Sequence, residues 1–134
     1  MLSLETIMKR YFSCSGQTVH RSFHSDIDEY PELAGLKDKA NDMQLIRMMN
    51  FIDTLTVNEV SKDHIQNIID GWEILIDETN REITPEYIGF YSLAVRHEQG
   101  LNSGSNKHLE LARVFANGFN NGIEPRDVLK GSLV

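Results

Sequence analysis

The spacing of apolar residues in the middle of the chain is the feature that most limits how it can fold. In residues 61–79 apolar side chains recur every three or four positions, which is the period of an α-helix with one buried face. Ser61 can cap that helix, and Thr84 followed by Pro85 starts a second helix in the same way. Apolar residues surround most of the second helix, so we predict that it is the central, most buried helix of the fold.

The same period predicts helices on both sides of this pair. They lie in residues 3–12, in residues 31–55 with a break near Asn41, in residues 106–120 with Ser105 as the cap, and in a short turn at residues 124–131. The fold class that follows is all-α: a single compact domain over residues 1–134 with about five helices, packed as a bundle or orthogonally. Glycines mark the expected helix ends, with Gly100 after the central helix, Gly122 after the next and Gly131 after the last.

Two stretches leave other structures open. Residues 17–25 alternate polar and apolar side chains well enough to form a small two-stranded element. Residues 72–84 allow a hairpin around Thr79 and Asn80, although their longer context favours a helix.

Composition places the chain among ordinary globular proteins. It has 134 residues, of which 40% are hydrophobic and 25% charged, and a single cysteine, so no disulfide can form within the chain. The N-terminus lacks the unbroken apolar run of a signal peptide, and no window is apolar for long enough to span a bilayer. We therefore expect a cytoplasmic protein that does not enter the membrane.

The charge is concentrated in the middle of the chain. Residues 26–86 hold fifteen acidic and five basic residues, a net charge of −10, whereas the remainder carries five acids and eight bases, a net charge of +3. An acidic belt repels phosphate backbones, so direct nucleic-acid binding is disfavoured. The belt is either a solvated face that keeps the protein soluble or the surface for a protein partner with a basic surface, which the functional hypothesis takes. The candidate partner-binding residues are Asp26, Asp28, Glu29, Glu32, Asp63, Asp70, Glu73, Asp77 and Glu78.

Reactive side chains gather in residues 13–30. His20 and His24 share a face whether the segment is helical or extended, and such a pair can bind zinc if further ligands join it. Cys14 with His20 could begin a nucleophilic pair, but it follows a helix instead of preceding one, so no helix dipole would activate its thiol. Polar connector residues explain the cluster better, and we assign no catalytic residue, metal or cofactor.

A second polar cluster surrounds His97 and His108. Position 101 is leucine, so the segment is not the HExxH motif of zinc proteases, and residues 100–105 lack the spacing of a nucleotide-binding loop. The last turn of a helix favours a histidine such as His97 through its dipole alone.

The function that these patterns favour is non-enzymatic. We expect an inhibitor, immunity protein, adaptor or regulator that binds another protein through its acidic middle. One alternative is a small metal- or cysteine-dependent hydrolase built from Cys14, His20 and His24, and another is a homodimeric helical module in which an inner stripe pairs between chains.

Overall fold

The computed structural model describes residues 30–101 and 107–132. These residues form a 3-10 helix and five α-helices, and they include no strand, so the all-α prediction is confirmed. The elements are η2 (Pro31–Leu33), α3 (Asp42–Val57), α4 (Lys62–Glu78), α5 (Pro85–Leu101), α6 (Lys107–Asn120) and α7 (Pro125–Ser132). The helix predicted in residues 3–12 and the strands predicted in residues 17–25 lie outside the described residues.

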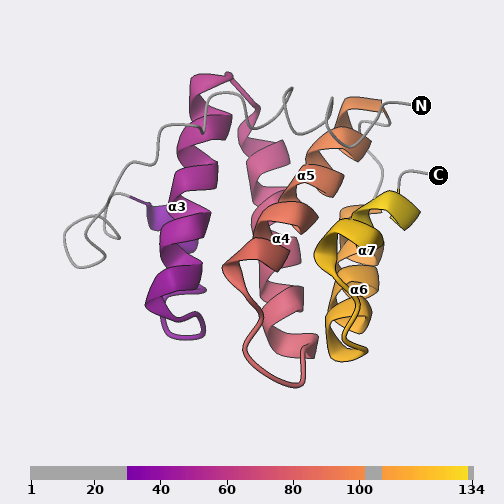
Figure 1. Ribbon diagram of the computed structural model, residues 1–134. Helices are drawn as coiled ribbons and strands as arrows, with labels where there is room; N and C mark the ends of the chain where they lie inside the picture. The colour runs from indigo at the N-terminus through magenta and orange to yellow at the C-terminus, as the bar shows by residue number, and fades with distance from the viewer. Residues whose placement is uncertain (1–29, 102–106, 133–134) are drawn as a thin grey trace.

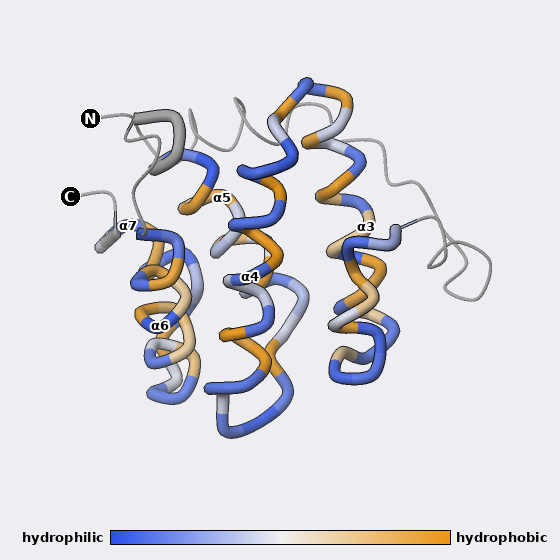
Figure 2. The backbone as a smooth tube through the Cα atoms, turned by 180° about the vertical axis from the view of Figure 1, so that it is seen from behind, coloured by the Kyte–Doolittle hydropathy of each residue, from blue (hydrophilic) through white to orange (hydrophobic). Residues whose placement is uncertain are grey.

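The helices are arranged side by side, with α3 at one edge, α6 and α7 at the other, and α4 and α5 between them (Figure 1). Apolar positions turn toward the neighbouring helices and polar positions turn outward, as the tube coloured by hydropathy shows (Figure 2). The buried apolar side chains of all these helices belong to one cluster, so the described part of the chain has one core. No described helix has the length and apolar character needed to cross a membrane.

The prediction that the central helix is the most buried one is confirmed. α5 packs against α3, α4, α6 and α7, and it buries side chains on several sides, among them Ile88, Leu93 and Ala94. Two methionines of α3, Met48 and Met49, are also fully buried.

Ser61 and Thr84 cap the starts of α4 and α5 as the sequence predicts, whereas the third predicted cap, Ser105, lies outside the described residues. The Ser61 hydroxyl accepts a hydrogen bond from the amide of His64 at 3.2 Å, and the Thr84 hydroxyl accepts one from the amide of Tyr87 at 3.2 Å. Asn41 and Gln44 form a reciprocal capping box, which is the physical basis of the predicted break near Asn41. Before that break the chain forms η2 and turns instead of a regular α-helix.

Two predicted helix ends are wrong. α5 continues through Gly100 to Leu101, and α7 continues through Gly131 to Ser132. Glycine permits a left-handed helix end but does not impose one, and of the described glycines only Gly122, with a φ of 74°, adopts that conformation.

The hairpin alternative around Thr79 and Asn80 is also wrong, because α4 runs to Glu78 and an irregular joint follows. The end of α6 holds this joint: the Asn120 side chain donates a hydrogen bond to the Glu78 carbonyl at 3.0 Å and accepts one from the Asn80 amide at 2.8 Å. Arg81 donates to the Phe119 carbonyl at 2.8 Å. Contacts between helices thus fix a segment whose local pattern is ambiguous.

Tyr91 of α5 ties three helices together. Its hydroxyl donates a hydrogen bond to the backbone carbonyl of His108 in α6 at 2.9 Å. To reach that carbonyl the ring crosses α4 at Gly71, where a Cβ atom would lie 1.5 Å from the tyrosine oxygen. A glycine inside a helix costs stability, and here the close approach of Tyr91 accounts for it.

Substitution Gly71→Ala tests this contact. The added methyl group has no room, so we expect the free energy of unfolding to fall by about 3 kcal/mol, measured by urea denaturation. Gly131→Ala is the matched control, because nothing lies within 4 Å of its added Cβ, and it should raise stability by up to about 1 kcal/mol through helix propensity. A Gly71→Ala protein as stable as the wild type would refute the close approach.

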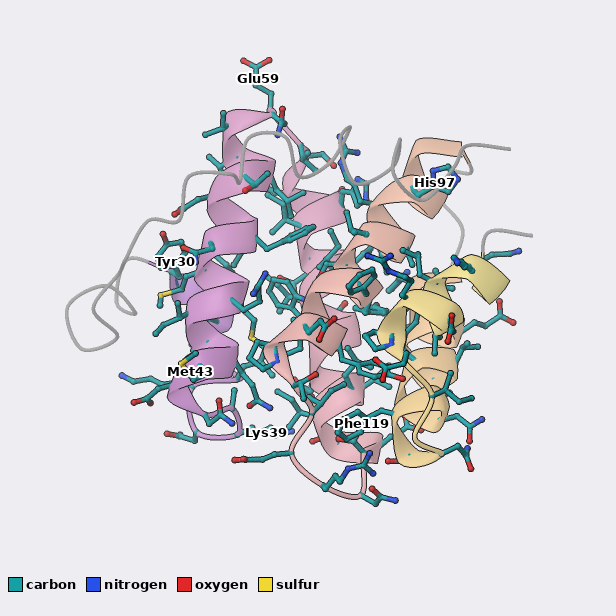
Figure 3. All side chains as sticks on the ribbon, viewed as in Figure 1. Tyr30, Lys39, Met43, Glu59, His97 and Phe119 are labelled. Carbon is teal, nitrogen blue, oxygen red and sulfur yellow. The ribbon has the colours of Figure 1, made fainter. Side chains whose placement is uncertain are left out.

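Glu59, two residues after the end of α3, has a backbone conformation that favours glycine. Its φ is 56°, and two hydrogen bonds, from the Val60 amide to the Leu55 carbonyl at 3.0 Å and from the Glu59 amide to the Thr56 carbonyl at 3.0 Å, complete a Schellman motif. The side chain points away from the molecule at the tip between α3 and α4 (Figure 3). The position therefore carries backbone strain without a buried side chain in compensation.

We expect Glu59→Gly to stabilise the fold by roughly 0.5–1 kcal/mol, because glycine removes the strain and its larger unfolded-state entropy offsets only part of the gain. Glu59→Ala removes the same charge but keeps the strained φ, so it separates the two effects. Thermal unfolding of both variants checks this, and an equal gain in both would show that the charge, not the backbone, matters.

Candidate functional site: the acidic face of α4

Four carboxylates line the outer side of α4. Asp63, Asp70 and Asp77 follow each other at intervals of seven residues, close to two helical turns, so they form a line along the helix, and Glu73 lies beside it. All four side chains are exposed. We call these four residues the acidic face; its line of aspartates extends over about 21 Å at 1.5 Å per residue.

The opposite side of α4 fixes the rotation of the helix. Ile68, Trp72 and Leu75 are fully buried, and α4 packs with this side against α5 and α6. The Trp72 indole donates a hydrogen bond to the Ser92 hydroxyl at 2.8 Å, and that hydroxyl donates to the Ile88 carbonyl at 2.7 Å. A buried indole N–H needs an acceptor, so this pair holds α4 with its carboxylates toward the solvent.

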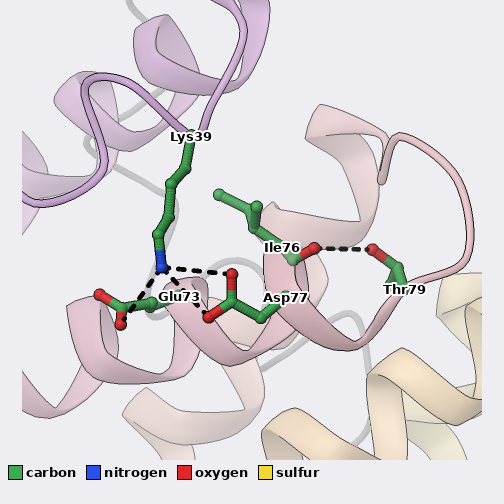
Figure 4. Close-up of polar contacts among 5 residues, drawn as sticks. All are labelled: Lys39, Glu73, Ile76, Asp77 and Thr79. Atoms are coloured by element: carbon green, nitrogen blue, oxygen red, sulfur yellow. Dashed lines mark hydrogen bonds and ion pairs between the residues drawn. The ribbon is translucent and has the colours of Figure 1, made fainter.

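Lys39 lies across one end of the acidic face. Its ammonium is 3.3 Å from Asp77 and 3.6 Å from Glu73, and it comes from the turns between η2 and α3 (Figure 4). The hydrogen bond to Asp77, together with the charges of both carboxylates, raises the pKa of Lys39 above its ordinary value. The face therefore already holds one cation between two of its carboxylates.

Other predicted binding residues lie apart from this face or pair differently. Glu78 approaches Arg113 of α6, with 3.6 Å between Oε2 and Nε, and so faces the side of α4 next to α6. Glu32 is exposed on η2, which packs against α4. The remaining three, Asp26, Asp28 and Glu29, lie outside the described residues.

The described residues do not test the histidine and cysteine hypotheses. Cys14, His20 and His24 lie outside the described residues, so their arrangement stays a prediction. His97 lies near the end of α5 and His108 at the start of α6. Within residues 30–101 and 107–132 no three histidine, cysteine or acidic side chains lie close enough together to hold a metal ion.

Sequence reasoning missed two residues that matter here. Lys39 is 38 residues from Asp77, and no local pattern links the two. His64 was not singled out, although it lies one turn before the buried Ile68, at the edge of the inner stripe, where a titratable side chain becomes partly buried. The position of His64 on the helix was the available signal.

Comparison of the chain with protein-family models, with curated proteins and with solved structures finds no match in any of the three.

Proposed function

We propose that this protein acts by binding a basic surface of another protein through the acidic face of α4, as an inhibitor, immunity protein, adaptor or regulator does. The observation that carries the proposal is the line of exposed aspartates on a helix whose rotation is fixed by its buried side. A rigid helix presents such charges without the loss of conformational freedom that a mobile segment would suffer on binding.

The position of the Lys39 ammonium supports the chemistry of this proposal. An ammonium between Glu73 and Asp77 is the interaction that a lysine or arginine of a partner would make with this face. At the other end, Asp63 and Asp70 are one repeat apart, about 10 Å along the helix. A partner with basic side chains at a matching spacing would fit them, and the opposite charges would speed its association.

The expected contribution of each charge is modest. Exposed ion pairs contribute about 0.5 kcal/mol each, so loss of three charges on the acidic face corresponds to roughly a tenfold loss of affinity. Such binding weakens as salt is added, because the Debye length shrinks to about 3 Å at 1 M.

The combined variant Asp63→Asn, Asp70→Asn, Asp77→Asn tests the proposal. These changes keep side-chain shape and remove three charges, so a protein captured by the wild-type chain from a lysate of its host should bind the variant about ten times more weakly in calorimetric titration. The matched control is Glu82→Gln, Glu86→Gln, Glu110→Gln, which removes three exposed charges away from the acidic face and should bind as the wild type does. Equal weakening in both variants would reduce the effect to net charge and refute the assigned surface.

Lys39→Gln provides a test in the opposite direction. Removal of the cation leaves Glu73 and Asp77 free for a partner, so we expect about threefold tighter binding to the captured partner at low salt and no gain at 1 M salt. Lys130→Gln is the control, because it makes the same change in net charge on a different helix, α7, which packs against α5 and α6. Unchanged or weaker binding by Lys39→Gln would show that the partner does not use this end of the face.

A further inference from the structure

We infer that His64 is an acid-sensitive latch: its neutral ring closes the junction where the start of α4 meets α5 and the start of α6, and its protonation opens that junction. This device is distinct from the acidic face, whose carboxylates lie on the outer side of the same helix.

The geometry shows why the ring has to be neutral. The Nε2 atom of His64 is buried from solvent and has no hydrogen-bond partner among the described residues, and the Nδ1 atom of His108 is in the same condition. His108 is only 5% exposed. A neutral ring nitrogen tolerates such a place, whereas a proton on Nε2 would add a buried donor with no acceptor and a charge.

The charges near His64 also favour its neutral form. Burial, the guanidinium of Arg96 in α5 and the ring of His108 in α6 lower the pKa of His64 to about 4, and a hydrogen bond with the backbone of Val95 opposes them only in part. The guanidinium of Arg96 is a cation, so a proton on His64 would be repelled by it.

Among the described residues, none of the other titratable or charged groups beside this junction is a cause of the shifted pKa of His64. On α4 itself Lys62 and Asp63 flank His64 in the sequence and are exposed. On α5 His97 follows Arg96, and Tyr91 contributes a hydroxyl whose pKa burial raises and which donates to the His108 carbonyl. On α6 Lys107 precedes His108 and is exposed.

The sign of the pH dependence follows from the two states. His64 has a pKa of about 4 in the folded chain and an ordinary value near 6.5 in the unfolded chain, so the unfolded chain binds the proton more readily. The stabilisation is complete above pH 6.5 and is lost as the pH falls from there toward 4. Between pH 7 and 5.5 a pKa shift of this size raises the unfolding equilibrium constant by at most about eightfold. Solvent screening of the half-buried ring weakens the effect, so we expect a rise of about threefold to eightfold.

Urea denaturation at pH 7.0, 6.0 and 5.5 measures this change. The wild-type chain should show a three- to eightfold larger rise in the unfolding constant over this range than His64→Gln, which is neutral at every pH. Lys62→Gln is the control, because it changes the charge of the neighbouring residue without a group that titrates in this range, and it should keep the wild-type slope.

Two measurements on the wild-type protein test the role of His64 even if the His64→Gln variant does not fold. In the wild-type protein the NMR signals of the His64 ring should remain those of neutral imidazole at pH 5.5. Amide hydrogen exchange, corrected for its intrinsic pH dependence, should become faster at residues 62–66 and 107–110 before the rest of the core. A His64 ring that titrates near pH 6.5 in the folded protein, or equal pH slopes for wild type and His64→Gln, would overturn the inference.

Discussion

The crossing of Tyr91 over Gly71 is the contact on which the rest of the fold depends. One side chain of the central helix passes the backbone of α4 and ends on a carbonyl of α6, so it sets how closely three helices approach one another. Phe115 packs edge-on against the same ring, with 5.7 Å between the ring centroids, and fills the space beside it. The mutual position of α4, α5 and α6 thus follows from one glycine and one buried tyrosine.

This packing determines what α4 presents to the solvent. Because Trp72 and its neighbours are buried against α5 and α6, the aspartates at intervals of seven residues can only point outward. Exposed charges of this kind add little to the stability of the fold, so the fold itself does not account for them. Their arrangement on a rigid helix is the physical reason for the proposed binding role, and Lys39 illustrates the kind of group they attract.

Local patterns determined the parts of the structure that the sequence predicts well. The caps Ser61 and Thr84 and the inner stripe of α4 depend on residues within a few positions of each other, and all are found as expected. Gly100 and Gly131 were predicted to follow the ends of helices because a glycine is a local stop signal, yet both helices include the glycine and one further residue. Glycine only permits a helix end, so its position alone does not fix one.

The candidate site was predictable only in part, because local patterns do not report contacts between segments that are distant in the sequence. The spacing of Asp63, Asp70 and Asp77 gives their common face directly, but no local signal shows that Lys39 reaches Asp77 or that Arg113 reaches Glu78. His108, which the sequence places in a polar cluster, is buried, because the start of α6 packs where Tyr91 donates to its backbone. Interactions between distant segments decide which charges remain available to a partner.

The most direct test of the proposed function is zero-length carbodiimide cross-linking of the complex between the wild-type chain and its captured partner, read by mass spectrometry. This reagent joins carboxylates to lysines that touch them. We expect the cross-links to start from Asp63, Asp70, Glu73 and Asp77 and to end on lysines of the partner. Cross-links that start instead from the carboxylates of α6 and α7, with those four residues unmodified, would contradict the proposed function.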